Sequence, residues 1–119
     1  MDKKRITPDQ VVEAYLATGL VPIRDGWTDR IGDRRCGCGL TAVATQISEA
    51  NYDRISNAIM EEYVIADLLD LSPKYVGGFA DGFDGGKRDP YESEDWQLGY
   101  EDGRSAWEAV KHLRDGVLA

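Results

Sequence analysis

The 119-residue chain is poor in the side chains that most enzymes use, with one histidine, His112, and two cysteines, Cys36 and Cys38. A single histidine leaves acid–base catalysis to carboxylates, and no Ser-His-Asp set, HExxH pair, P-loop or GxGxxG stretch is present. We therefore expect no catalytic site, and we expect His112 to be a solvated side chain.

The two cysteines also offer little to a metal ion. A disulfide between residues this close in sequence would be strained, so free thiols are expected, and whether they are reactive stays open. A closed zinc site needs four nitrogen or sulfur ligands, and His112 is far from the cysteines in sequence. We expect no metal and no cofactor.

Residues 81–92 resemble a calcium-binding loop only in part. Acidic residues occupy the first, ninth and twelfth positions, but Phe83 and Gly85 stand at the third and fifth, where oxygen ligands are required. The match therefore fails.

No stretch of about 18 apolar residues could cross a bilayer, and no apolar run follows the basic start of the chain. We expect a cytoplasmic protein, and its length favours one domain over residues 1–119.

The net charge of −8 is unevenly distributed. Residues 1–50 hold seven acidic and seven basic residues, whereas residues 51–119 hold fifteen acidic and seven basic residues. Because nucleic-acid affinity depends on Lys and Arg, this surface disfavours direct DNA binding and favours a basic or protein partner.

The chain should be mainly α-helical, starting with a helix over 8–18. Thr7 is placed to cap it, Gln10 to complete a capping box, and Gly19 to end it in the left-handed conformation. We expect a loop with a short strand or hairpin over 20–38 and a second helix over 39–49. A third helix is expected over about 53–70, on an apolar stripe at helical spacing: Ile55, Ile59, Tyr63, Ala66 and Leu69.

Two further helices complete an expected set of five. Ser72 should cap a helix over 73–84, which Gly85 ends. Ser93 should cap the last helix, which reaches about Leu113, with Gly116 just past its end. Its predicted buried face consists of Trp96, Gly99, Tyr100, Gly103, Ala106, Trp107, Val110 and Leu113.

A short pattern occurs twice in these last two helices, as GFADG at 78–82 and GYEDG at 99–103. Four glycines inside helices together forgo roughly 4 kcal/mol of helix propensity, so another interaction must offset that cost. Glycines four residues apart share one helix face, which predicts a close antiparallel helix pair packed through Gly78, Gly82, Gly99 and Gly103.

A second interpretation is a groove with a glycine floor and aromatic walls. The acidic residues beside such a groove favour a basic peptide or helix as its occupant, since aromatic side chains often anchor interfaces. The candidate binding residues are Phe79, Asp81, Phe83, Asp84, Tyr91, Trp96, Tyr100, Glu101 and Asp102, with Tyr75 and Trp107 as further aromatic anchors.

The tract over about 77–107 resembles the ribosome modulation factor family. The likeness lies in the order Gly-Phe-x-x-Gly-Phe-x-Gly over 78–85, Pro90-Tyr91, and Trp-x-x-Gly-Tyr-x-x-Gly-Arg over 96–104. The resemblance implies two helices joined by a loop and, as in the named member, binding to the small ribosomal subunit during hibernation. That ribosome binder is basic, whereas this tract is acidic.

Residues 65–76 have the apolar spacing of a helix-turn-helix core, with Asp70 in place of the usual turn glycine. A DNA reader would carry basic or amide side chains on the second helix, but this helix offers Lys74, Asp81 and Asp84. The pattern therefore predicts the packing of two helices.

Together these patterns predict a non-catalytic, acidic interaction module that binds a protein with a basic surface through the helix pair of residues 73–113. Three alternatives stay open: a ribosome-associated factor, a small-molecule binder, and a nucleic-acid-mimicking inhibitor of a host nuclease or defence complex of the kind found in bacteria and phages. The ribosome alternative needs a basic face formed by Lys3, Lys4, Arg5, Arg24, Arg30, Arg34 and Arg35. The mimic would use Asp81, Asp84, Asp89, Glu92, Glu94, Asp95, Glu101 and Asp102 as phosphate substitutes.

Overall fold

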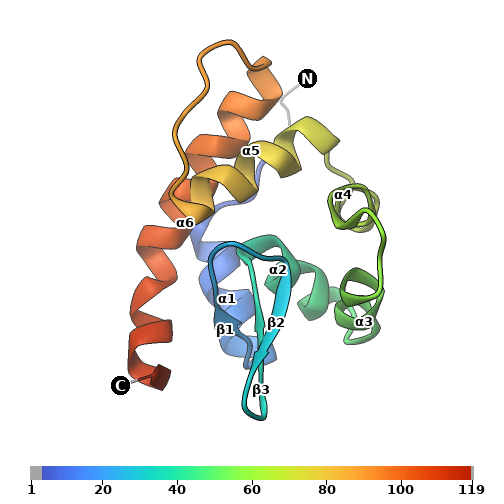
Figure 1. Ribbon diagram of the computed structural model, residues 1–119, viewed down its shortest axis with the longest axis vertical. Coiled ribbons are helices and arrows are strands. Elements are labelled where there is room, and N and C mark those ends of the chain that lie inside the picture. The colour runs from blue at the N-terminus through green and yellow to red at the C-terminus, as the bar shows by residue number, and fades with distance from the viewer. Residues whose placement is uncertain (1–3, 119) are drawn as a thin grey trace.

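The computed structural model describes residues 4–118, and for residues 115–118 it describes the backbone alone. Within that range the chain forms six helices and one three-stranded sheet (Figure 1). The elements are α1 (Pro8–Thr18), β1 (Val21–Pro22), β2 (Thr28–Ile31), β3 (Arg34–Gly37), α2 (Gly39–Ile47), α3 (Ala50–Ser56), α4 (Glu61–Leu69), α5 (Pro73–Asp84) and α6 (Glu94–Leu118). The mainly helical class is confirmed, and no helix in the described part of the chain is long and apolar enough to span a membrane.

Helix α1 begins and ends as its sequence predicts. The Thr7 side chain accepts a hydrogen bond from the Gln10 backbone, and the Gln10 side chain accepts one from the Thr7 backbone, so the capping box is complete. Gly19 ends the helix with φ of 73° and donates to the Tyr15 carbonyl. This left-handed conformation is costly for residues other than glycine.

The predicted loop at 20–38 contains a small sheet of order β1-β3-β2. Strand β1 pairs with β3 in parallel, and β2 pairs with β3 as an antiparallel hairpin. Two tyrosine hydroxyls fix this sheet to the helices: Tyr15 on α1 donates to the Gly37 carbonyl, and Tyr52 on α3 donates to the Cys36 carbonyl. These tyrosine contacts, which no local pattern reveals, lie between residues distant in sequence.

The prediction of one continuous helix over about 53–70 is wrong. The structure divides it into α3 and α4, with a break between Ser56 and Glu61. Ile55 is buried as expected, but Ile59 is 98% exposed and Tyr63 is 52% exposed. The stripe that suggested one long helix therefore does not lie on one buried face.

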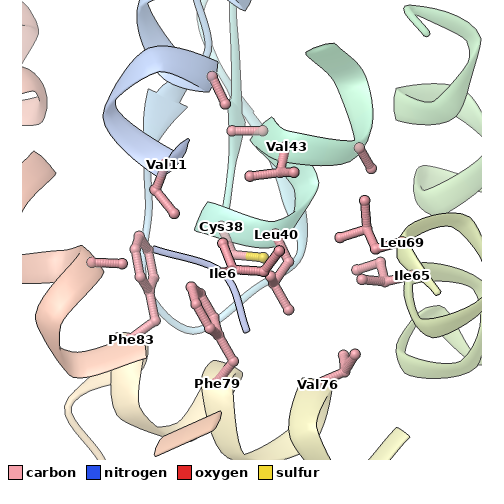
Figure 2. Packing of buried hydrophobic residues seen from close by; sticks show 14 of the residues in the cluster. Ile6, Val11, Cys38, Leu40, Val43, Ile65, Leu69, Val76, Phe79 and Phe83 are labelled. Atoms are coloured by element: carbon pink, nitrogen blue, oxygen red, sulfur yellow. The ribbon is translucent and has the colours of Figure 1, made fainter. Parts of the chain in front are cut away.

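The core lies where α5 meets α1, α2 and α4. Figure 2 shows Phe79 and Phe83 extending from α5 toward Val11 on α1 and Leu40 on α2. Both phenylalanine side chains are fully buried, and Ile65 and Leu69 of α4 close the core on another side. Burial of a phenylalanine side chain contributes about 1.5–3 kcal/mol, so these two residues are structural.

Helices α5 and α6 pack closely but are not antiparallel. Contacts along the pair run in the same order on both helices, because Tyr75 lies against Gly99 and Phe79 lies against Gly103. Figure 1 shows the reason: residues 85–93 return along the outside, so α6 starts near the beginning of α5 and crosses it in the same general direction. Helix α6 also continues past Leu113 and through Gly116, which corrects its predicted end.

Candidate functional site

The four repeated glycines form a seam in which the two helix backbones touch. A Cβ atom added at Gly78 or Gly82 would lie 2.1 Å from the carbonyl oxygen of Trp96 or Tyr100 on α6. One added at Gly99 or Gly103 would lie 2.1 Å from the carbonyl oxygen of Tyr75 or Phe79 on α5. Small residues allow helices this close an approach, and Cα–H groups then face carbonyl oxygens.

The same reciprocity extends to the side chains beside the seam. The Tyr75 hydroxyl on α5 donates to the Asp102 carboxylate on α6 at 2.5 Å. In the matching position, the Trp96 side chain on α6 lies beside the Asp81 carboxylate on α5 and partly opposes the rise in its pKa that burial causes. The repeat is therefore two copies of aromatic-x-x-Gly-aromatic-x-Asp-Gly, each of which contacts the other.

This closed seam corrects the prediction of a groove with a glycine floor. No space remains between the helices, where even one added methyl group would overlap a carbonyl oxygen. A small molecule lined by the two glycine faces, as one alternative required, does not fit there.

Most of the predicted aromatic anchors lie in the core. Phe79 and Phe83 have no exposed surface, and the other buried members are Tyr75, Trp96, Tyr100 and Trp107. Their buried side chains serve mainly to pack the fold, and of these residues only Trp96 also borders the surface hollows described below. Tyr91 differs, because its side chain is 95% exposed on the loop between α5 and α6.

The predicted acidic residues do not form one surface. Asp102 accepts two hydrogen bonds from the Arg5 guanidinium, at 2.8 and 2.9 Å, in addition to the Tyr75 hydroxyl. Glu101 lies within 3.6 Å of Arg5 and 3.7 Å of Arg88. These two carboxylates are therefore held by basic side chains, on a different element from Asp81 and Asp84.

Asp81 and Asp84 instead border a groove along the outer side of α5. Two adjoining hollows share Trp27, Ala80 and Asp81, so they form one continuous surface. One hollow has a volume of about 400 Å³, within the usual size of small binding sites. We call this surface the acidic groove; its residues are Asp25, Gly26, Trp27, Cys38, Glu62, Lys74, Gly77, Ala80, Asp81, Asp84, Glu92 and Trp96.

The acidic groove contains five carboxylates and one lysine. Lys74 is already bonded to Glu92 at 3.2 Å, so it does not offset the other four carboxylates. Burial raises the pKa of Asp81, which the Trp96 side chain partly opposes. Burial also raises the pKa of Asp84, and the hydrogen bond from the Asp25 backbone N–H opposes it.

Trp27 is fixed in position at the centre of the acidic groove. Its carbonyl accepts hydrogen bonds from the Thr41 hydroxyl at 2.7 Å and from the Cys38 backbone N–H at 3.2 Å. The residue is half-buried, packs against the hydrophobic core and lines both hollows. The groove therefore places an aromatic surface among carboxylates.

The sequence alone did not identify Trp27, Asp25 or Glu62 as site residues. They lie on the loop before β2 and on α4, far in sequence from the helix pair on which the prediction was based. The sequence offered one signal for this part of the site: Asp25 lies two residues before Trp27, in a loop that packs on the core.

The described residues contain no group of three or more His, Cys, Asp or Glu side chains placed to hold a metal ion. Cys36 and Cys38 are both buried free thiols, and burial raises the pKa of each. Their thiols therefore stay protonated at neutral pH.

Helices α4 and α5 meet at a tight turn in which Asp70 has φ of 54°. This is the left-handed conformation for which glycine is usual, so the turn has the local geometry that the sequence pattern suggested. The outward side of α5 carries the acidic groove where a DNA reader would need basic or amide side chains.

No protein-family model, curated protein or solved structure matches this chain.

Proposed function

We propose that the protein is a non-catalytic binding module whose acidic groove receives a basic segment of a partner protein. The observation that carries the proposal is the placement of Asp25, Glu62, Asp81 and Asp84 around the indole of Trp27. The partner would contribute Arg or Lys side chains, because complementary charge favours association and opposes wrong partners.

The shape of the groove supports a side chain as its occupant. A guanidinium or ammonium group entering the hollow can pair with Asp81 or Asp84 while it lies near the Trp27 indole. Cation–π contacts contribute about 0.5–1 kcal/mol at exposed sites and more where water is excluded. Tyr91, exposed on the loop that also carries Glu92, is available to contact the flanking part of the segment.

The raised pKa values of Asp81 and Asp84 support the same proposal. Partial burial of a carboxylate is unfavourable for the isolated protein, since water is removed from the charged form. A cationic side chain would compensate for that lost solvation. Residues that serve binding often lower the free energy of unfolding of the isolated protein.

The nucleic-acid-mimic alternative receives less support from these positions. Phosphates of a duplex lie on a convex surface, whereas Asp81 and Asp84 line a hollow, and Asp102 is bonded to Arg5. The ribosome alternative requires a shared basic face. Of its residues, Arg5 is bonded to Asp102, Arg24 stacks on Trp107, and Lys3 lies outside the described residues.

The test is a titration of a fluorescein-labelled peptide of alternating Arg and Gly, followed by fluorescence anisotropy. The wild type is compared with Asp81→Asn/Asp84→Asn and with the control Asp33→Asn/Asp53→Asn, which removes the same charge from exposed positions outside the groove. The groove variant should bind about tenfold more weakly, and the control should change by less than about twofold.

A peptide of alternating Gln and Gly serves as the neutral probe and should not bind. Trp27→Leu should weaken binding of the Arg peptide without any change in charge. Equal losses in the two Asp→Asn variants would contradict the proposal, because the peptide would then be responding to net charge and not to a site.

A further inference from the structure

A second surface of different character lies on the outer side of α3 and α4. It contains three strongly exposed apolar side chains: Ile59 at 98%, Met60 at 58% and Tyr63 at 52%. Figure 1 shows these two helices at the edge of the molecule opposite α6, away from the seam. We call this surface the α3–α4 face; its residues are Arg54, Ala58, Ile59, Met60, Tyr63, Val64, Asp67 and Leu68.

The apolar residues on α4 follow its helical period. Val64 and Leu68 on α4, and Met60 just before it, are four residues apart, whereas Ile65 and Leu69 point to the core and are buried. Val64 and Leu68 are half-buried against the edge of the core, so this second apolar side of α4 is only partly covered within the described chain. Clustered exposed apolar residues commonly mark an interaction site.

The α3–α4 face is also hollowed, and the hollow has a volume of about 410 Å³. Arg54, Ala58, Val64, Asp67 and Leu68 line it. Ile59, the next residue after Ala58, projects into solvent beside this hollow. The face thus carries both a protruding apolar side chain and a space able to accept one.

The charges at this hollow are balanced and unpaired. Arg54 and Asp67 are its only charged lining residues, and none of the ion pairs or side-chain hydrogen bonds found within residues 4–118 involves either side chain. When two copies of such a surface face each other, the cation of each copy can pair with the anion of the other, and the apolar side chains can pack between them. This differs from the acidic groove, which is complementary only to a cation.

We infer that the α3–α4 face binds a second copy of this chain in a two-fold symmetric dimer. In such an isologous contact, Arg54 of each protomer pairs with the partner's Asp67, so two ion pairs form. The exposed apolar side chains, Ile59 foremost, are then buried between the protomers. This assignment is independent of the proposed binding of a basic segment, because it uses a different surface.

Charge reversal provides the sharpest test. Arg54→Glu places a carboxylate against the partner's Asp67, and Asp67→Arg places a guanidinium against the partner's Arg54, so each variant repels its own copy twice. In an equimolar mixture of the two variants, the heterodimer has two pairs of opposite charge: the introduced carboxylate faces the introduced guanidinium, and Asp67 of one chain faces Arg54 of the other, so dimerisation should be restored. The double variant restores both ion pairs in its own homodimer.

The measurement is sedimentation equilibrium across the micromolar range in moderate salt, which screens the general repulsion between acidic chains. The wild type and the double variant should dimerise, and each single reversal should raise the dissociation constant at least about tenfold. Ile59→Asp should have the same effect. Arg34→Glu and Asp33→Arg, reversals at the exposed hairpin, are the matched controls and should dimerise like the wild type.

Circular dichroism should show the same helical content for every variant, because all the substituted side chains are exposed or line the open hollow. A wild type that is monomeric at every concentration would overturn the inference and leave this face to a different protein. A wild-type dimer that is unaffected by the Arg54, Asp67 and Ile59 variants would overturn it too.

Discussion

The carbonyl oxygen of Tyr75 lies directly over Gly99, while the carbonyl oxygen of Trp96 lies over Gly78. Tyr75 and Trp96 each stand three residues before the glycine of their own helix, so the contact is reciprocal. The repeated sequence therefore has a structural origin: each copy supplies the carbonyl oxygens that face the glycines of the other.

The first prediction concerns Gly78→Ala. The added methyl group would overlap a backbone carbonyl that cannot move without separating the helices, so overpacking should outweigh the gain of about 1 kcal/mol in helix propensity. The free energy of unfolding, measured by urea denaturation, should fall by about 2 kcal/mol or more.

Gly77→Ala is the matched control on the same helix. A Cβ there would meet only the Glu62 carboxylate, whose nearest oxygen is 3.2 Å away at the end of a flexible side chain. The control should therefore be neutral or stabilising by up to about 1 kcal/mol. Equal destabilisation by both substitutions would show that the seam is not the critical contact.

The second prediction concerns the Tyr75 hydroxyl, which accepts a hydrogen bond from the Ile6 backbone at 2.8 Å and donates one to Asp102. Tyr75→Phe removes both bonds and leaves the buried Ile6 N–H without its partner. The free energy of unfolding should fall by about 1–3 kcal/mol. Tyr91→Phe, at an exposed hydroxyl, should have no measurable effect.

Alkaline pH gives a second measurement at the same residue. Burial and the hydrogen bond to Asp102 raise the pKa of Tyr75 in the folded state. The folded state therefore retains this proton where the unfolded state loses it, so stability is full below pH of about 10 and falls as pH rises above it. The Tyr75→Phe variant should show a shallower alkaline decline; an unchanged slope would contradict this assignment.

The third prediction concerns the stability cost of Asp81 and Asp84. Burial raises both pKa values in the folded state, so each carboxyl group favours folding most when it is protonated and less as pH rises above about 4. Asp81→Asn/Asp84→Asn should thus stabilise the protein at pH 7 relative to wild type, by about 0.5 kcal/mol. The advantage should disappear near pH of about 3, below the usual pKa of an aspartate; an advantage that persists there would have another cause.

The fourth prediction concerns Arg24, which connects the sheet to the helix pair. Its guanidinium lies 4.1 Å from the centre of the Trp107 ring, and its Nε donates to the Phe83 carbonyl near the end of α5. Arg24→Gln should lower the free energy of unfolding by about 1–2 kcal/mol, because it removes a cation from a helix C-terminus and from an aromatic ring. Arg34→Gln, at an exposed position, should leave it unchanged.

Local signals predicted the parts of the fold that depend on neighbouring residues. The caps at Thr7, Ser72 and Gly85 and the bounds of α1 and α5 are confirmed, since each depends on residues a few positions apart. The buried face of α6 is confirmed at Trp96, Tyr100, Ala106, Trp107 and Val110 for the same reason.

Features set by contacts across the chain were not predictable in this way. The direction of α6 relative to α5 depends on the path of residues 85–93, and the glycine spacing is compatible with either direction. The break after Ser56 also depends on tertiary packing. Ile59 is 98% exposed, so the apolar residues on either side of the break do not share one buried face. The acidic groove combines α4, α5 and the loop before β2, so only two of its acids, Asp81 and Asp84, belonged to the predicted binding residues.

The reciprocal seam also determines where this sequence can change in length. One residue inserted between Gly78 and Gly82, or between Gly99 and Gly103, would turn the second glycine of that pair by about 100° around its helix and bring a side chain against a carbonyl. The exposed loop at 85–93 carries no such requirement, so insertions there should be tolerated. In related chains, evolution should therefore have preserved the four-residue intervals and allowed the distance between the two copies to vary.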